Sequence, residues 1–201
     1  MLLAQITLAG PPMICHEFEI GGEKSLPWNT GTDWDLQVSS YDTTRLIQDT
    51  LALLTPNTPV IARMETLRRA VIYSGKKREI ALDLASRLKQ RADKPQADPL
   101  AAFDAGYFIE AMHQYGPILG ADPLKGMDGY SIARKSVGQA KDVAAVEYGL
   151  ALMQATKSWP NDHYRNAVLG AMEGSLLAKN LLRTANAASL SSLRNTVLAR
   201  R

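Results

Sequence analysis

The chain has 201 residues, of which 46% are hydrophobic and 21% charged, and its formal net charge is +3. These values fit one globular domain with its own core, and they exclude a chain that is disordered throughout. A single cysteine, Cys15, excludes an internal disulfide framework and metal sites that need several cysteines. The sequence contains no run of about 20 apolar residues, so it predicts no membrane-spanning helix.

Residues 1–41 predict an N-terminal arm that packs on the rest of the protein. The apolar start, MLLAQITLAG, has two interpretations. It is either what remains of an export signal, which favours an exported or periplasmic protein, or an apolar part of the arm in a cytoplasmic one. Residues 21–41 are rich in Gly, Pro, Asn and Asp, which is typical of a loop. We expect Trp28 and Trp34 to anchor this loop to the helical body.

The stretch ICHEFEI at 14–20 alternates in polarity, which favours an extended segment. Its apolar side, with Ile14 and Phe18, is expected to dock on the body. Cys15 then lies among acidic residues, which raise the pKa of a thiol and make it a poor nucleophile. The alternative is a hydrolase in which Cys15 works with His113 or His163.

From Asp42 onward, apolar residues recur at helical spacing and capping residues mark the helix starts. The segment 116–129 is irregular, and WPND at 159–162 is a break with Asn161 or Asp162 as the next cap. The pattern predicts helices over 42–54, 58–75, 76–93, 98–115, 142–158, 162–184 and 189–201, and a short one near Tyr130. The predicted class is all-α: stacked antiparallel helical hairpins over 42–201, as a short solenoid or a bundle.

The stretch LRRAVIYSGKKREIALDLASRL at 67–88 resembles one tetratricopeptide unit. Tyr73 lies near the end of its first helix, Gly75 forms the turn, and Ala81 and Ala85 are small where hairpins pack. The resemblance implies stacked hairpins with a concave binding surface. The stretches ICHEFEIGGEKSLPW, METLRRAVIY and FDAGYFIEA are similar to a set of predicted exported bacterial proteins of unassigned function, a similarity that implies no mechanism.

Charge divides the first half of the chain. Residues 15–49 contain seven acidic and two basic side chains, whereas 63–94 contain ten basic and four acidic ones. The two segments are either solvated faces of opposite sign, or the acidic arm folds back over the basic helices. The basic hairpin 63–94 also favours an alternative function in nucleic-acid binding, although it lacks interleaved aromatic residues.

Asp104 lies on an apolar stripe, so its carboxylate must be paired or must open onto a groove. Arg68 holds the corresponding position in the preceding hairpin. The sequence therefore predicts either a buried Arg68–Asp104 ion pair or the polar floor of a ligand groove, which Tyr73, Tyr107 and His113 would line.

The function predicted first is a helical-repeat binding or scaffold protein that recognises a peptide, a protein or an envelope component and has no catalytic activity. Its predicted binding residues are Arg68, Tyr73, Asp104, Tyr107 and His113. The histidines and the cysteine show no metal-ligand spacing, and the chain contains no cofactor motif, so neither a metal nor a cofactor is predicted.

Overall fold

A computed structural model describes residues 10–94, 96 and 98–199. The prediction of an all-α fold is confirmed for this part of the chain, where the only β-type pairing is an isolated bridge between Trp28 and Gln37. No helix in the described ranges is both long and apolar enough to cross a membrane. The two interpretations of the apolar start concern residues 1–9, which lie outside the described residues.

The helices follow the arm in chain order, and a 3₁₀ turn at Thr43–Arg45, capped by the Asp42 side chain, leads into the first of them. A second 3₁₀ turn spans Arg134–Ser136. The α-helices of the described residues are α1 Leu46–Leu53, α2 Val60–Ser74, α3 Arg78–Ala92, α4 Ala101–Leu119, α5 Gly129–Ala133, α6 Val143–Met153, α7 Asp162–Gly170, α8 Leu176–Ala185 and α9 Leu190–Ala199.

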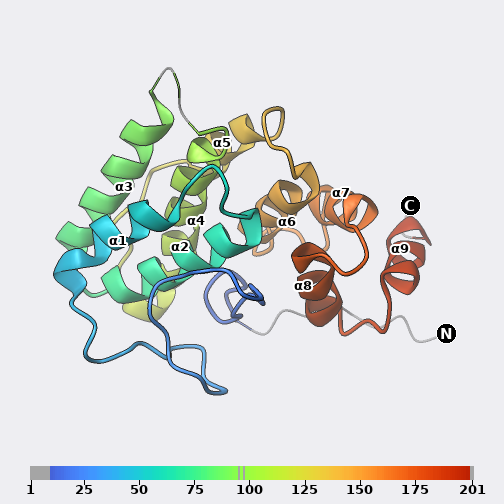
Figure 1. Ribbon diagram of the computed structural model, residues 1–201, viewed down its shortest axis with the longest axis horizontal. Coiled ribbons are helices and arrows are strands. Elements are labelled where there is room, and N and C mark those ends of the chain that lie inside the picture. Colours follow the sequence, from blue (N-terminus) through green and yellow to red (C-terminus); the bar gives the residue numbers. More distant parts are fainter. Residues whose placement is uncertain (1–9, 95, 97, 200–201) are drawn as a thin grey trace.

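The core surrounds α2 and α4. Every residue of α2 is buried, the charged ones included, because α1, α3, α4 and α6 pack against it and the arm bonds to it. Helix α4 packs against α2, α3, α5 and α6, and α6 packs against α7 (Figure 1). Helices α8 and α9 lie at the opposite end of the molecule from α1 and α3 (Figure 1). The polar side chains of α2 are therefore held inside the protein.

Three predicted helix boundaries are wrong. The helix expected over 142–158 ends at Met153, and residues 154–157 form turns. Helix α4 continues through Gly116-Pro117 to Leu119 and ends where Gly120 adopts a left-handed φ of 73°. A proline so near the C-terminal end removes only one helical hydrogen bond. The helix expected over 162–184 is two helices, because Gly174 has a φ of 74° and Ser175 caps α8. The residue that caps α7 is Asn161, one of the two caps that the sequence predicted.

Gly106 allows α4 and α5 to approach closely. A Cβ atom added at Gly106 would lie 2.2 Å from the carbonyl oxygen of Gly129 and 2.6 Å from the backbone nitrogen of Ala133. We expect Gly106→Ala to lower the free energy of unfolding by about 1–3 kcal/mol, because backbone atoms must move apart. Chemical denaturation of the variant measures this loss. Gly138→Ala is the control, since a Cβ there meets no atom within 4 Å. Equal stability of the two variants would contradict the close packing.

The arm follows the lower side of α2 in Figure 1 before it reaches α1. Its first part is a turn and not an extended strand, because the amides of Ile14 and Cys15 both donate to the carbonyl oxygen of Pro11. The extended conformation predicted for 14–20 is therefore wrong at Ile14 and Cys15, although Ile14 is fully buried, as expected. The predicted burial of Phe18 is confirmed, with 4% of the residue exposed.

Candidate functional site

Three charged residues on one face of α2 form a buried cluster. Glu65, Arg68 and Arg69 lie three and four positions apart, so they share a face of the helix. The Glu65 carboxylate accepts hydrogen bonds from Arg68 Nε at 2.9 Å and from Arg69 Nε at 2.6 Å. The side chains of Glu65 and Arg68 are completely buried, and that of Arg69 is 11% exposed. Remaining donors and acceptors of this cluster point at the arm.

Side chains of the body hold the first part of the arm through hydrogen bonds to its main chain. The amide of Met13 donates to Gln114 Oε1 at 3.1 Å, and the carbonyl oxygen of Ile14 accepts from Arg68 Nη1 at 2.9 Å. The amide of Phe18 donates to Glu65 Oε2 at 3.0 Å. Gln114 also donates to the carbonyl oxygen of Leu152 at 2.9 Å, so its amide group is fixed in orientation. All of these bonds are buried.

Asn180 of α8 binds both main-chain groups of one arm residue. Its Oδ1 accepts from the amide of Glu19 at 2.9 Å, and its Nδ2 donates to the carbonyl oxygen of Glu19, also at 2.9 Å. Nδ2 makes a further bond to the carbonyl oxygen of Leu176, which sets the direction of the amide group. Such a paired contact recognises an extended backbone whatever side chain the residue carries.

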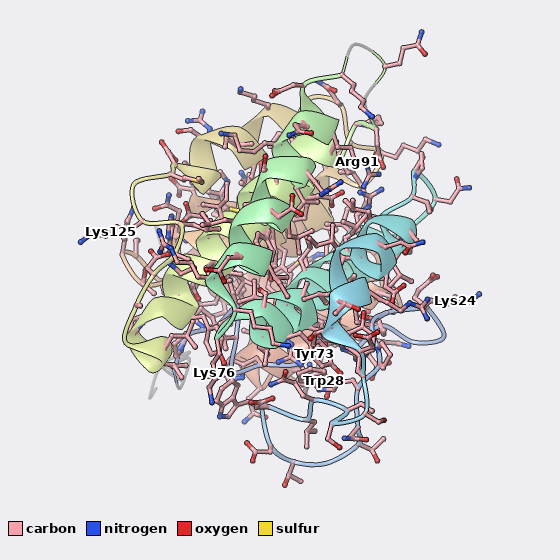
Figure 2. The ribbon with its side chains drawn as sticks, turned by 90° about the vertical axis from the view of Figure 1, so that its left-hand side faces the viewer. Lys24, Trp28, Tyr73, Lys76, Arg91 and Lys125 are labelled. Carbon is pink, nitrogen blue, oxygen red and sulfur yellow. The ribbon has the colours of Figure 1, made fainter. Side chains whose placement is uncertain are left out.

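The later part of the arm lies against the C-terminal half of α2. Arg69 Nη1 donates to the carbonyl oxygen of Leu26 at 2.7 Å. The hydroxyl of Tyr73 donates to the carbonyl oxygen of Pro27 at 2.7 Å and accepts from the amide of Val38 at 3.0 Å. Figure 2 shows Trp28 beside Tyr73, and their ring centroids are 5.6 Å apart. We use the term arm groove for the surface formed by Glu65, Arg68, Arg69, Tyr73, Gln114 and Asn180.

The arm adds apolar contacts to these main-chain bonds. Met13, Ile14, Phe18 and Leu26 are at most 4% exposed, whereas Trp28 and Trp34 are only half-buried. The expected contact of both tryptophans with the body is confirmed, because Trp28 packs on Tyr73 and Trp34 packs on Tyr115, with ring centroids 5.6 Å and 6.1 Å apart. The acidic arm and the basic helix do meet, because Arg69 Nη2 lies 3.1 Å from Glu17 Oε1.

The predicted ion pair between Arg68 and Asp104 is wrong. Asp104 is fully buried and bonded to an arginine, but the partner is Arg63, whose Nη1 lies 2.5 Å from Asp104 Oδ2. Arg63 and Asp104 occupy the first turns of α2 and α4, where the two helices meet. Arg68 is five residues further along α2 than Arg63, about 7.5 Å along the axis. Its guanidinium group pairs with Glu65.

A second buried cluster surrounds Asp104. Arg63 also pairs with Asp98 at 2.5 Å, and Arg91 lies 3.2 Å from the same Asp98 oxygen and 3.8 Å from Asp104. Arg63 further donates to the carbonyl oxygen of Thr58 at 3.0 Å. These contacts join the starts of α2 and α4 to the end of α3. The cluster therefore holds the body together, and among residues 10–41 of the arm none is bonded to it.

Burial raises the pKa of Asp104 to about 7, although the guanidinium groups of Arg63 and Arg91 lower it. Between about pH 4 and pH 7 the native state keeps a proton that the unfolded state has released. The free energy of unfolding should therefore fall as the pH rises through this window, by up to about 1.4 kcal/mol per pH unit.

Asp104→Asn should remove this part of the pH dependence, because the amide does not titrate. Urea unfolding across the window measures the difference from the unmodified protein. Asp83→Asn is the control, since Asp83 is exposed and pairs only with the exposed Arg87. Identical pH profiles for the protein and Asp104→Asn would show that Asp104 titrates normally.

The five predicted binding residues do not form one groove. Arg68 and Tyr73 contact the arm, whereas Asp104 and Tyr107 are fully buried in the core. Burial raises the pKa of Tyr107 well above its ordinary value. His113 faces another side of α4, where its Nδ1 lies 2.6 Å from Asp122 Oδ2 and its Nε2 lies 2.9 Å from the carbonyl oxygen of Met127.

His113 lines a depression of about 610 Å³ between α4, α5 and the end of α6. Glu110 and Tyr130 lie in the same wall, and the amide of Tyr130 donates to Glu110 Oε1 at 3.0 Å. The Tyr130 hydroxyl is 2.6 Å from His163 Nε2, and His163 Nδ1 is 2.5 Å from Glu147 Oε2. These hydrogen bonds join the loop 120–128 and α5 to the neighbouring helices.

The geometry gives Cys15 no histidine partner from the body. Both ring nitrogens of His113 and of His163 are engaged with the groups named above. The pKa of the Cys15 thiol is raised, as predicted, but the cause is burial and not neighbouring acids, and the guanidinium of Arg68 acts in the opposite direction. This arrangement does not favour a nucleophilic thiolate.

The basic excess of 63–94 does not form one surface. Arg63, Arg68 and Arg69 are buried inside ion-pair clusters. The exposed bases of the segment are on or beside α3, and Figure 2 shows Lys76 at its start. The observation on which the nucleic-acid alternative depended is therefore weaker than the residue count indicates.

Sequence reasoning missed Glu65, Arg69, Gln114 and Asn180 as parts of the groove. Only Glu65 carried a usable signal, since it is the single acid within the basic run 63–78 and lies three positions before Arg68. Gln114 and Asn180 are ordinary polar residues of helices, and their roles depend on contacts with residues 101 and 161 positions away.

Comparison of the chain with protein-family models, curated proteins and solved structures finds no match.

Proposed function

We propose that the protein is a non-catalytic helical binding protein that holds an extended segment of a partner protein in the arm groove. In the state described above, the chain's own arm occupies this groove. The observation that carries the proposal is the paired contact of Asn180 with both main-chain groups of Glu19. A groove that binds main-chain groups can accept another segment of similar shape.

The other contacts support the same proposal. The side chains that also bind main-chain atoms of the arm are Glu65, Arg68, Arg69, Tyr73 and Gln114, so with Asn180 six side chains of the body meet its backbone. Their orientations are fixed by bonds within the body, as for Asn180 to Leu176 and Gln114 to Leu152. Groups that are already oriented lose little freedom when a segment binds.

Exchange of the arm tests the proposal. Ser39 and Ser40 form an exposed turn near the end of the arm, so a protease site can be inserted between them. After cleavage, the arm is held without a covalent link. A fluorescent peptide that covers residues 10–40, with serine in place of Cys15, is then added in excess.

We expect the labelled peptide to replace the cleaved arm, with a rise in fluorescence anisotropy that saturates while the helical circular dichroism is unchanged. The same protein with Asn180→Ala should bind the peptide more weakly, because it loses both bonds to Glu19. If the arm leaves only when the helices unfold, the arm is an integral part of the fold and the proposal fails.

A further inference from the structure

We infer that the arm groove selects acidic segments in which an aliphatic residue stands three positions before an acidic residue and an aromatic residue follows it. Ile14, Glu17 and Phe18 present this pattern. The inference rests on the proposed function and adds the chemistry of the partner. Main-chain bonds alone do not select a sequence, so selectivity must come from side chains. Ile14 and Phe18 are buried, and Glu17 pairs with Arg69 although 43% of its own side chain is exposed.

The aromatic position has an enclosed site of its own. The Phe18 ring packs edge-to-face on Tyr148, with the centroids 6.3 Å apart, and Tyr148 is 1% exposed. The hydroxyl of Tyr148 lies 2.8 Å from Thr184 Oγ1, which fixes the ring that receives Phe18. A depression of about 280 Å³ opens beside this pair, lined in part by Arg183, so a larger ring can also enter. The site therefore fits aromatic residues as a class.

The acidic position balances the charge of the groove. Arg68 and Arg69 bring two positive charges, and Glu65 supplies one negative charge. The Glu17 carboxylate, 3.1 Å from Arg69 Nη2, compensates the remaining positive charge. The Arg69 side chain is 11% exposed and the Glu17 side chain 43%, so water screens this pair only in part. A neutral or basic residue here would leave Arg68 and Arg69 to share the single negative charge of Glu65.

The aliphatic position is the most enclosed of the three. Ile14 is completely buried, and its carbonyl oxygen accepts from the buried Arg68. A polar side chain at this position would lose its contact with water and gain no partner from the apolar core. The arm groove thus contacts both the main chain and the side chain of Ile14.

The occupant to which we assign the groove is a segment of a partner protein with this pattern. Charge complementarity supports the assignment, since the occupant must bring a negative charge and the groove carries an excess positive one. The arm then acts as an internal competitor that covers the groove until such a segment displaces it.

Competition in the cleaved protein tests the selectivity. The labelled arm peptide is bound first, and unlabelled peptides of the same length that differ at one position then displace it. We expect Phe18→Ala and Ile14→Ser peptides to compete at least about 30-fold more weakly than the original, because buried apolar contacts are lost. The Glu17→Gln peptide should compete about 3- to 10-fold more weakly.

Glu19→Gln is the matched control for the acidic position. Glu19 is exposed, and its carboxylate accepts from the amide of Gly21 within the arm, so this peptide should compete as well as the original. Peptides that all bind equally would overturn the selectivity but leave the proposed function in place. If no peptide binds, both proposals fail. A dimer that forms by exchange of arms, seen by light scattering without any bound peptide, would assign the groove to a second copy and overturn the inference.

Discussion

Glu65→Ala is expected to lower the free energy of unfolding by about 3–5 kcal/mol, because it removes the carboxylate that pairs with the buried Arg68 and leaves Arg69 with Glu17. Glu65 accepts from Arg68, from Arg69 and from the amide of Phe18, so one truncation removes partners on the helix and on the arm. The arm should also detach more readily. Urea unfolding measures the loss, and limited proteolysis in the exposed turn 39–40 measures the detachment.

Two further variants separate charge from general damage to the helix. Glu65→Gln keeps an acceptor for Arg68 or Arg69 but removes the charge, so its stability should lie between those of the protein and Glu65→Ala. Asp83→Ala breaks an exposed pair with Arg87, and this change should cost less than about 1 kcal/mol. If Glu65→Ala costs no more than Asp83→Ala, the buried cluster does not stabilise the fold.

Arg63→Leu is expected to cause a loss of similar size, again about 3–5 kcal/mol, because it strands Asp104 and Asp98. The loss should be larger above pH 7, where Asp104 is ionised, than at lower pH, where burial keeps it protonated. Since no residue among 10–41 of the arm is bonded to this cluster, proteolysis of the turn 39–40 should change less than in Glu65→Ala at equal overall stability. Unfolding in urea at two pH values measures both effects.

Arg87→Leu is the matched control for Arg63→Leu. Arg87 belongs to an exposed pair on α3, with 54% of its side chain accessible, so the variant should stay within about 1 kcal/mol of the protein. Asp104→Asn combined with Arg63→Leu should recover part of the stability, because it removes the stranded carboxylate. A double variant as unstable as Arg63→Leu alone would contradict the assigned pairing.

The sequence allowed the fold class and several local features to be predicted. Apolar spacing gave the all-α class, Asn161 was identified as a cap, and Phe18 was expected to be buried. These features depend on residues close together in the chain, where periodicity and capping chemistry act directly. The burial of Asp104 also followed from its place on an apolar stripe, although its partner did not.

The charged residues of α2 show why the rest could not be predicted. Periodicity places apolar residues on one face and assumes that the other face meets water, whereas the arm covers the face with Glu65 and Arg68. Arg63 and Arg68 differ by five positions, and choosing the partner of Asp104 between them required the relative position of α2 and α4 along their axes. The role of Asn180 depends on a contact across 161 positions.

Native-state hydrogen exchange of the unmodified protein tests most directly whether the arm is a docked segment that can leave the folded body. The amides of Met13, Phe18 and Glu19 are bonded to Gln114, Glu65 and Asn180, so their exchange reports the opening of the arm groove. We predict that these amides exchange with a lower opening free energy, and a weaker dependence on denaturant, than the amides of α2 and α4. Exchange of all of them with one free energy, equal to that of global unfolding, would contradict the account.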